Sequence, residues 1–205
     1  MPVCKDREYR MMTAPMTTAN NEETNDYKVE GYATTFNDPY VLFSDGDKDF
    51  LECVDSRAFD GTDMSDVIFQ YDHSGMVYAR NKNNTLQLTV DDHGLKINAY
   101  LGSTEASRQM YEAIDSGLID QMSFAFVVDD EEYDQRTHTR TIKHIRKLYD
   151  VSAVSIPANP GTEISARTAF EGYIEAERLE ELAAEQRREQ IERIKNLLKG
   201  DQNGN

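Results

Sequence analysis

Apolar and polar side chains alternate most clearly over residues 120–126, which read Asp-Gln-Met-Ser-Phe-Ala-Phe. Alternate side chains of a strand point to opposite faces, so Met122 and the two phenylalanines are predicted to share an apolar face. Ser123 and Ala125 then lie on the other face, which is small and polar. A hydroxyl held on a rigid strand suits a nucleophile, but serine is a poor nucleophile without a base. The segment therefore directs attention to histidines elsewhere in the chain.

Further strands are predicted by short runs rich in β-branched and aromatic residues that end at Gly, Pro, Asn or Asp. Turn residues at 44–47 and 91–94 predict two hairpins, and residues 131–140 predict a charged hairpin end. The other predicted strands are residues 27–36, 40–43, 49–53, 67–73, 85–90, 95–101, 141–145 and 148–156. The chain is therefore expected to be rich in strands.

Two segments have helical patterns. Residues 103–117 repeat apolar side chains at helical spacing, with Ser103 or Thr104 as the cap and Gly117 as a left-handed end. From residue 170 to 199 the chain is dominated by Glu, Arg, Ala, Leu and Gln, with a thin apolar seam. This second segment predicts a long solvated helix that pairs weakly or only with a partner.

Three parts are distinguished by composition. Residues 1–26 are rich in Thr, Asn, Met and Glu without periodicity, and are expected to be a mobile arm. Residues 27–168 hold the predicted strands and the first helix. Residues 169–205 form the charged helical tail.

Composition also limits the function classes. The 205 residues carry a net charge of −16, which disfavours coating of DNA or RNA and binding to anionic membranes. No apolar run approaches the length of a transmembrane helix, and the N-terminus lacks the apolar stretch of a signal peptide. Cys4 and Cys53 give neither a disulfide framework nor metal-ligand spacing, which favours a reducing, intracellular setting.

The four histidines differ as candidate bases. His93, His138 and His144 fall in predicted turns or in the charged hairpin and are expected to be surface residues, and the spacing of the last two fits no familiar metal site. His73 ends a predicted core strand just before a glycine turn, where a side chain is exposed to solvent while its backbone is held rigidly. From the residues alone, His73 is either a structural histidine or a base.

A triad also needs an acid that bonds the far imidazole nitrogen. Asp72 points away from His73 in a strand, and Asp120 lies too close to Ser123 to leave room for an imidazole. Asp150 is predicted in mid-strand, where an unpaired carboxylate is expensive. It pairs either with His73 or with a cation such as Arg146 or Lys147, or else it lies on an exposed face, so the residues alone leave its role open.

An ordered set of short motifs resembles a known family. The motifs are Gly31-Tyr32-Ala33, the strand ending in His73, the turn before Gly94-Leu95, Gly117 followed by Met122 to Phe126, Asp150-Val151-Ser152, Pro157-Ala158 and Thr162 to Arg167. They recur in this order in phage prohead proteases, the head-maturation serine proteases of tailed phages, which are related in fold to herpesvirus assemblins. The resemblance covers about residues 27–168.

The resemblance implies a compact β-barrel flanked by helices, with Ser123 as nucleophile, His73 as general base and Asp150 as the acid, a position that is often Glu in relatives. The oxyanion donors are expected to be backbone N–H groups near Ser123, with Arg167 as a side-chain candidate. The implied function is a serine endopeptidase, without metal or cofactor, that cleaves scaffold or major capsid protein segments, and itself, inside the assembling prohead in the host cytoplasm. The tail is predicted to mediate incorporation into the shell or self-association.

Two alternatives belong to other classes. A non-catalytic scaffolding protein built on a relic protease fold would need no intact set at positions 73, 123 and 150. An esterase on small substrates would favour a Gly-x-Ser-x-Gly elbow, and Ser123 has no such glycines around it.

Overall fold

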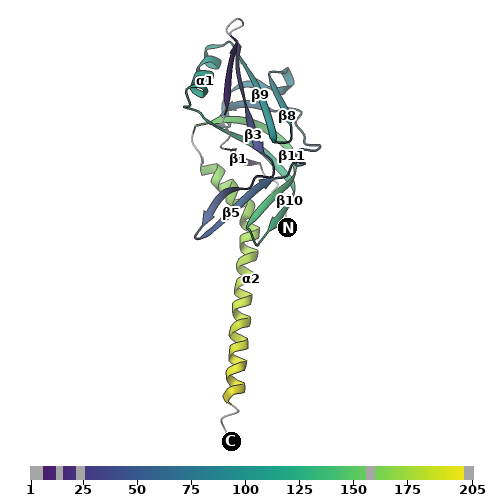
Figure 1. Ribbon diagram of the computed structural model, residues 1–205, viewed down its shortest axis with the longest axis vertical. Coiled ribbons are helices and arrows are strands. Elements are labelled where there is room, and N and C mark those ends of the chain that lie inside the picture. Colours follow the sequence, from purple (N-terminus) through teal and green to yellow (C-terminus); the bar gives the residue numbers. More distant parts are fainter. Residues whose placement is uncertain (1–6, 13–15, 22–25, 156–159, 201–205) are drawn as a thin grey trace. The chain divides into compact units, whose positions relative to one another are not determined.

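The computed structural model describes residues 7–12, 16–21, 26–155 and 160–200 of the chain (Figure 1). The described residues are mainly β, with two α-helices, the second of them long and C-terminal. This confirms the predicted α+β, mainly β class. No helix in these ranges is both long enough and apolar enough to cross a membrane.

The chain divides into two compact units, Met1–Ala169 and Phe170–Asn205. The first unit contains all the strands of the described residues, arranged in two sheets. The second consists of most of the long helix, and each unit is described by itself.

The larger sheet has seven strands, and β10 and β11 are its long central pair (Figure 1). From one edge to the other the order is β1, β10, β11, β5 and β4, while β6 pairs with β11 and with β7. The strands are β1 (Glu8–Met12), β4 (Tyr40–Asp45), β5 (Lys48–Val54), β6 (Ile68–Tyr71), β7 (Ser74–Arg80), β10 (Gln121–Asp134) and β11 (Thr139–Val154). A short 3₁₀ turn, Asn81–Asn83, follows β7.

The smaller sheet has four antiparallel strands in the order β2, β3, β9, β8. They are β2 (Thr17–Asn21), β3 (Asp26–Thr35), β8 (Leu86–Val90) and β9 (Gly94–Gly102). Gly94 begins β9 where the backbone of β3 passes closely, since a Cβ there would lie 2.0 Å from the carbonyl oxygen of Thr34. Only glycine fits this approach, and the β8–β9 hairpin predicted around residues 91–94 is confirmed.

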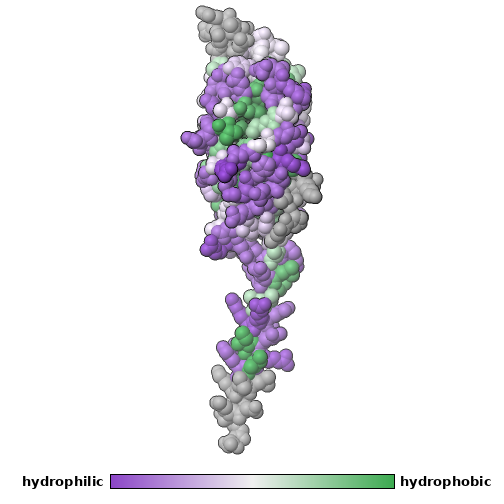
Figure 2. Space-filling model, turned by 90° about the vertical axis from the view of Figure 1, so that its right-hand side faces the viewer, coloured by the Kyte–Doolittle hydropathy of each residue, from purple (hydrophilic) through white to green (hydrophobic). Residues whose placement is uncertain are grey.

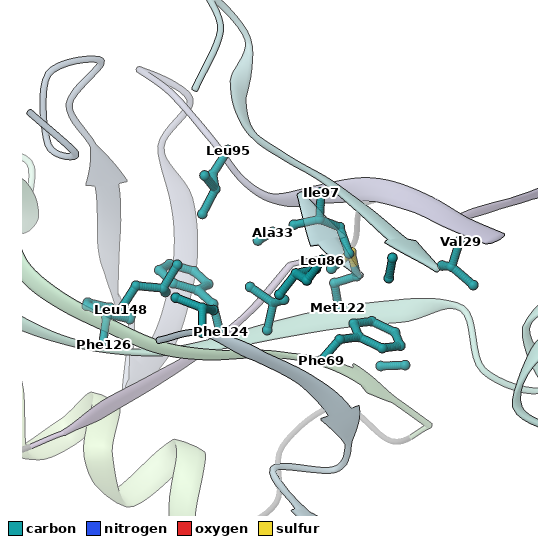
Figure 3. Close-up of a cluster of buried hydrophobic side chains, with 14 of the residues drawn as sticks. Val29, Ala33, Phe69, Leu86, Leu95, Ile97, Met122, Phe124, Phe126 and Leu148 are labelled. Atoms are coloured by element: carbon teal, nitrogen blue, oxygen red, sulfur yellow. The ribbon is translucent and has the colours of Figure 1, made fainter. Parts of the chain in front are cut away.

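Apolar side chains from both sheets meet in one core (Figure 3). Val29, Ala33, Leu86, Leu95 and Ile97 come from the smaller sheet. Opposite them lie Phe69, Met122, Phe124, Phe126 and Leu148 of the larger sheet. The alternation around Ser123 thus predicted correctly that Met122 and the two phenylalanines face the core, which leaves Ser123 on the other side of β10.

Helix α1 (Glu105–Asp115) has the caps that the sequence predicts. The Thr104 side chain accepts a hydrogen bond from the Ser107 N–H, and Gly117 has a φ of 74° just after the helix. Leu118 follows this glycine outside the helix and is 74% exposed.

Helix α2 (Pro160–Gly200) begins ten residues earlier than the predicted segment 170–199. In its second-unit part, apolar side chains form separate patches between hydrophilic ones (Figure 2). The exposed large apolar residues here are Leu179, Leu182, Ile191 and Ile194. Apolar residues are therefore exposed along this helix, but in separate patches and not as one continuous seam.

Three expectations differ from the structure. Within the range 1–26, expected as a mobile arm, β1 and β2 are paired strands, although their sequences lack an alternating pattern. Strand β7 was not predicted, because Ser-Gly-Met-Val-Tyr-Ala-Arg starts with turn residues and remains largely exposed. The expected barrel is not closed by the strand pairs of the described residues, because β1 and β4 remain as edges of the larger sheet.

Candidate active site

His73 lies in the two-residue turn between β6 and β7. Tyr71 pairs with Ser74, and Asp72 and His73 between them have φ values of 51° and 55°. Hairpin turns of this kind need positive φ at both central residues, and Asp and His tolerate that conformation better than β-branched residues. The predicted strand 67–73 therefore ends at Tyr71. The turn, and not a strand face, directs the imidazole.

Ser123 is held by strands on both sides. In β10 it lies opposite Ser152 of β11 and opposite Met11 of β1. Ladder hydrogen bonds on two sides fix the backbone, and the residue is only 2% exposed. Its neighbour on the same face, Ala125, is small, as the sequence pattern indicated.

Three distant residues meet at this point, and we call Ser123, His73 and Asp150 the serine trio. The His73 Nε2 atom lies 2.6 Å from Ser123 Oγ. The Nδ1 atom of the same ring lies 2.6 Å from Asp150 Oδ1. The Asp150 side chain is 4% exposed and the His73 side chain 15%, so the imidazole is the accessible member. Hydroxyl, imidazole and carboxylate thus form one hydrogen-bonded chain, the arrangement that activates a serine.

The register of β10 and β11 explains why Asp150 contacts His73. It lies opposite Ala125, on the same face as Ser123, and β6 pairs alongside so that its turn reaches that face. The alternatives lie elsewhere: Asp72 and Asp120 are exposed, and Lys147 bonds Asp63 at 2.8 Å. The open choice for Asp150 is thereby decided in favour of contact with His73.

Ser152 and Tyr9 also contact the serine trio, and neither was predicted as a site residue. The Ser152 hydroxyl donates to Asp150 Oδ1 at 2.8 Å and lies 3.3 Å from His73 Nδ1. The Tyr9 ring meets the His73 ring edge to face, with centroids 4.8 Å apart. Ser152 is two residues after Asp150 and shares its face, a signal that period two supplies once the acid is known.

Strand β1 covers the candidate nucleophile, Ser123. Ser123 Oγ donates a hydrogen bond to the backbone carbonyl of Arg10 at 2.9 Å. A hydroxyl has one proton, so the Arg10 carbonyl competes with His73 Nε2 for it. The peptide unit that follows Arg10 therefore lies directly beside the candidate nucleophile.

Five charged side chains form a second buried group, and we call Glu8, Arg10, Glu52, Glu131 and Arg140 the buried ion cluster. Arg10 and Arg140 are 0% exposed. Arg10 forks onto both oxygens of Glu52 at 2.6 and 2.9 Å. Arg140 forks onto both oxygens of Glu8 at 2.8 and 2.9 Å and also bonds Glu52 and Glu131. Each buried charge is thus paired, as burial requires.

The electrostatics of this cluster follow from burial and pairing. Burial alone would raise the pKa of Glu52, but the charges of Arg10 and Arg140 outweigh it and lower the pKa to about 2. The pKa of Arg10 is raised although burial opposes its charge, because Glu52 and Glu8 are close. Burial and then the Glu52 charge raise the pKa of Tyr40, whose hydroxyl donates to Glu52 at 2.7 Å. Glu52 is therefore ionised and Tyr40 is a neutral donor.

The remaining predicted residues lie outside the serine trio. His93 packs its ring edge against Tyr32, His138 contacts Phe50, and His144 Nε2 lies 3.1 Å from the Asp60 carbonyl. The Arg167 guanidinium lies 5.0 Å above the Phe43 ring, so its oxyanion role stays a prediction. In the part of the chain that the structure describes, no three His, Cys, Asp or Glu side chains are grouped as metal ligands.

Comparison with known families gives a match over residues 14–175, to the model of the Caudovirus prohead serine protease family. The match covers most of the 205 residues. The chain belongs to this family. The resemblance read from the sequence is thus confirmed, and the family acts as serine peptidases of phage prohead and capsid maturation. No curated protein and no solved structure gives a significant match.

Proposed function

We propose that this prohead protease family member is an active serine endopeptidase that cleaves scaffold or major capsid protein segments, and itself, during prohead maturation. The observation that carries the proposal is the unbroken chain from Ser123 Oγ through His73 to Asp150, with both heavy-atom distances at 2.6 Å. A relic fold kept only for scaffolding has no need of this alignment. Family membership supplies the class of substrate.

In the proposed mechanism each member of the serine trio has one role. His73 Nε2 takes the Ser123 proton as the oxygen attacks a peptide carbonyl, and returns it to the leaving amine. Asp150 accepts the Nδ1–H bond, which fixes the tautomer and stabilises the imidazolium. Ser152 donates to the same carboxylate and holds it in place. Backbone N–H groups near Ser123, with Arg167 as the side-chain candidate, stabilise the oxyanion.

The test is co-expression of the chain with its cognate major capsid and scaffold proteins. Wild type is expected to give defined cleavage products, and Ser123→Ala to reduce their rate by roughly 10⁴-fold or more. Ser103→Ala is the matched control, because Ser103 is exposed and remote in the chain from the serine trio. Thermal unfolding of each variant checks whether the fold is retained. Identical products from wild type and folded Ser123→Ala would refute the proposal and favour a non-catalytic scaffolding role.

We also propose that the helical tail, residues 169–205, mediates incorporation into the shell. Its support is the combination of a charged surface with exposed Leu179, Leu182, Ile191 and Ile194, which a solitary helix gains nothing by exposing. A truncation that ends near Arg167 is expected to cleave substrate in solution but to be missing from purified proheads. Normal incorporation of the truncated chain would refute this role.

A further inference from the structure

Strand β1 lies where an extended substrate is expected to bind. It pairs antiparallel with β10, the strand of the nucleophile, and Met11 lies opposite Ser123. Peptides commonly bind as an added strand at the edge of a sheet, with side chains of alternate residues entering pockets. The Arg10 carbonyl already accepts the Ser123 hydrogen bond at 2.9 Å, so the Arg10–Met11 peptide bond is the one presented to the hydroxyl.

Two charged side chains of β1 bind residues of opposite charge on neighbouring strands. Arg10 forms a two-bond fork with Glu52 of β5. Two residues earlier, Glu8 receives a two-bond fork from Arg140 of β11. Such forks recognise both charge and planar shape, which a single ion pair does not. Residue 9 points the other way, and the Tyr9 ring lies against His73.

The two recognising residues have partners of their own apart from β1. Arg140 bonds Glu52 at 2.7 Å and Glu131 at 2.8 Å, and Tyr40 bonds Glu52 at 2.7 Å. These contacts hold Glu52 and Arg140 in position when another peptide replaces β1. The family match begins at residue 14, after β1 ends, so the strand precedes the part of the chain that the family shares.

We propose that β1 is an intramolecular substrate, and that the peptidase cleaves after an arginine that follows an acidic residue by two positions. Glu52 is the residue that selects the arginine, and Arg140 selects the acid. The self-cleavage bond is Arg10–Met11. The proposal rests on the endopeptidase function proposed above and adds its specificity.

The chemistry needs water as its only co-reactant. Ser123 Oγ bonds to the Arg10 carbonyl carbon, and the bond from that carbon to the Met11 nitrogen breaks. The serine proton passes through His73 to the Met11 nitrogen, which leaves as a free amine. Water then hydrolyses the ester, leaves Arg10 with a carboxylate and returns a proton to Ser123.

The experiment uses the full chain, wild type and Ser123→Ala, with a ten-residue peptide of residues 5–14 and mass detection of the products. Cleavage between Arg10 and Met11 is expected with wild type only. Replacing Arg10 by alanine in the peptide is expected to lower kcat/KM roughly thirtyfold or more, because alanine cannot form the forked ion pair with the Glu52 carboxylate. Replacing Arg7 instead is the matched control, because Arg7 is exposed and lies over Tyr149.

A second measurement separates recognition from mere stability. Citrulline has nearly the shape of arginine without its charge, so wild type is expected to prefer the Arg10 peptide over its citrulline version by roughly thirtyfold. In Glu52→Gln this ratio is expected to fall to about threefold or less. A structural role of Glu52 would lower both rates and leave the ratio unchanged. Should Glu52→Gln fail to fold, the peptide series alone still decides the proposal.

The outcomes distinguish this specificity from the function beneath it. Ser123-dependent cleavage of capsid or scaffold protein at sites that lack arginine would overturn the specificity and leave the endopeptidase intact. An alanine peptide cleaved as fast as the Arg10 peptide would do the same. Absence of any Ser123-dependent product, from peptide or from assembly proteins, would overturn both.

Discussion

The serine trio and the buried ion cluster are two groups of buried polar side chains, and strand β1 contributes to both through alternate residues. Tyr9 lies against His73, whereas Glu8 and Arg10 belong to the cluster. In the serine trio each hydrogen bond runs along one line from hydroxyl to carboxylate. In the cluster each arginine bonds two or more carboxylates, so the bonds form a closed network.

These two bonding patterns suit different roles. In a linear chain with one accessible imidazole, the imidazole takes the hydroxyl proton and the carboxylate stabilises the imidazolium that forms, which suits catalysis. A closed network of forked ion pairs holds all its partners in fixed positions, which suits stability or recognition. Mutations are therefore expected to affect activity at the serine trio and the free energy of unfolding or the specificity at the cluster.

The largest effect in this comparison is expected for Asp150→Asn. The amide cannot accept the Nδ1–H bond as a carboxylate does, so the imidazole adopts the wrong tautomer and kcat falls by roughly 10³- to 10⁴-fold. Asp72→Asn is the matched control, because Asp72 neighbours His73 but is exposed, and Asn tolerates its positive φ. Cleavage kinetics of the two variants check this. Near-normal activity of Asp150→Asn would mean that the carboxylate only holds the fold.

The two groups also differed in how far the sequence predicted them. Ser123, His73 and Asp150 were found because each is a polar residue inside or beside an apolar strand. A polar group buried there needs a hydrogen-bond partner, and the search for that partner led from one residue to the next. Glu8, Glu52, Glu131 and Arg140 are scattered among many acidic and basic residues of a chain with net charge −16. Only the parallel pairing of β5 with β11 and the edge pairing of β1 bring them together, and local pattern does not encode such pairings.

The elements show the same division between local and long-range information. The β4–β5 and β8–β9 hairpins and helix α1 were predicted because turn residues, caps and periodicity lie within the segment itself. Strands β1 and β2 were missed because their order comes from partners far along the chain. The His73 turn was misread as strand, since Tyr-Asp-His continues the alternation although both Asp72 and His73 adopt positive φ.

Removing a cation from the cluster is expected to cost more stability than any change at the serine trio. Arg140→Leu leaves Glu8, Glu52 and Glu131 buried with one cation fewer, so the free energy of unfolding should fall by about 3–5 kcal/mol. Arg136→Leu, with its side chain 89% exposed beside Asp134, should change it by about 0.5 kcal/mol or less. Urea unfolding measures both. Equal losses would show that burial does not determine how much these ion pairs contribute to the free energy of unfolding.

Lowering the pH is expected to reduce the free energy of unfolding more for wild type than for Glu52→Gln, which has no carboxylate at this position. The pKa of Glu52 falls from 4.5 to about 2 in the folded chain, so its charge stabilises the fold above about pH 4.5. That contribution is lost as the pH falls from about 4.5 towards 2. Unfolding free energies measured at pH 7, 5, 4 and 3 should therefore drop more steeply for wild type than for Glu52→Gln. Parallel pH curves would place the acid sensitivity in other carboxylates.

The smallest effect on kcat is expected from removing the Ser152 hydroxyl, which donates one neutral hydrogen bond to the serine trio. Ser152→Ala removes the 2.8 Å bond to Asp150 but leaves the His73 contact, so kcat should fall only about fivefold, in line with roughly 1 kcal/mol for one hydrogen bond. Ser155→Ala is the matched control on the same stretch of chain, because its hydroxyl bonds Tyr71 and not the serine trio. Ser152→Thr keeps the hydroxyl and should restore most of the rate. A loss as large as that of Asp150→Asn would instead show that the Asp150 carboxylate cannot act without the Ser152 hydrogen bond.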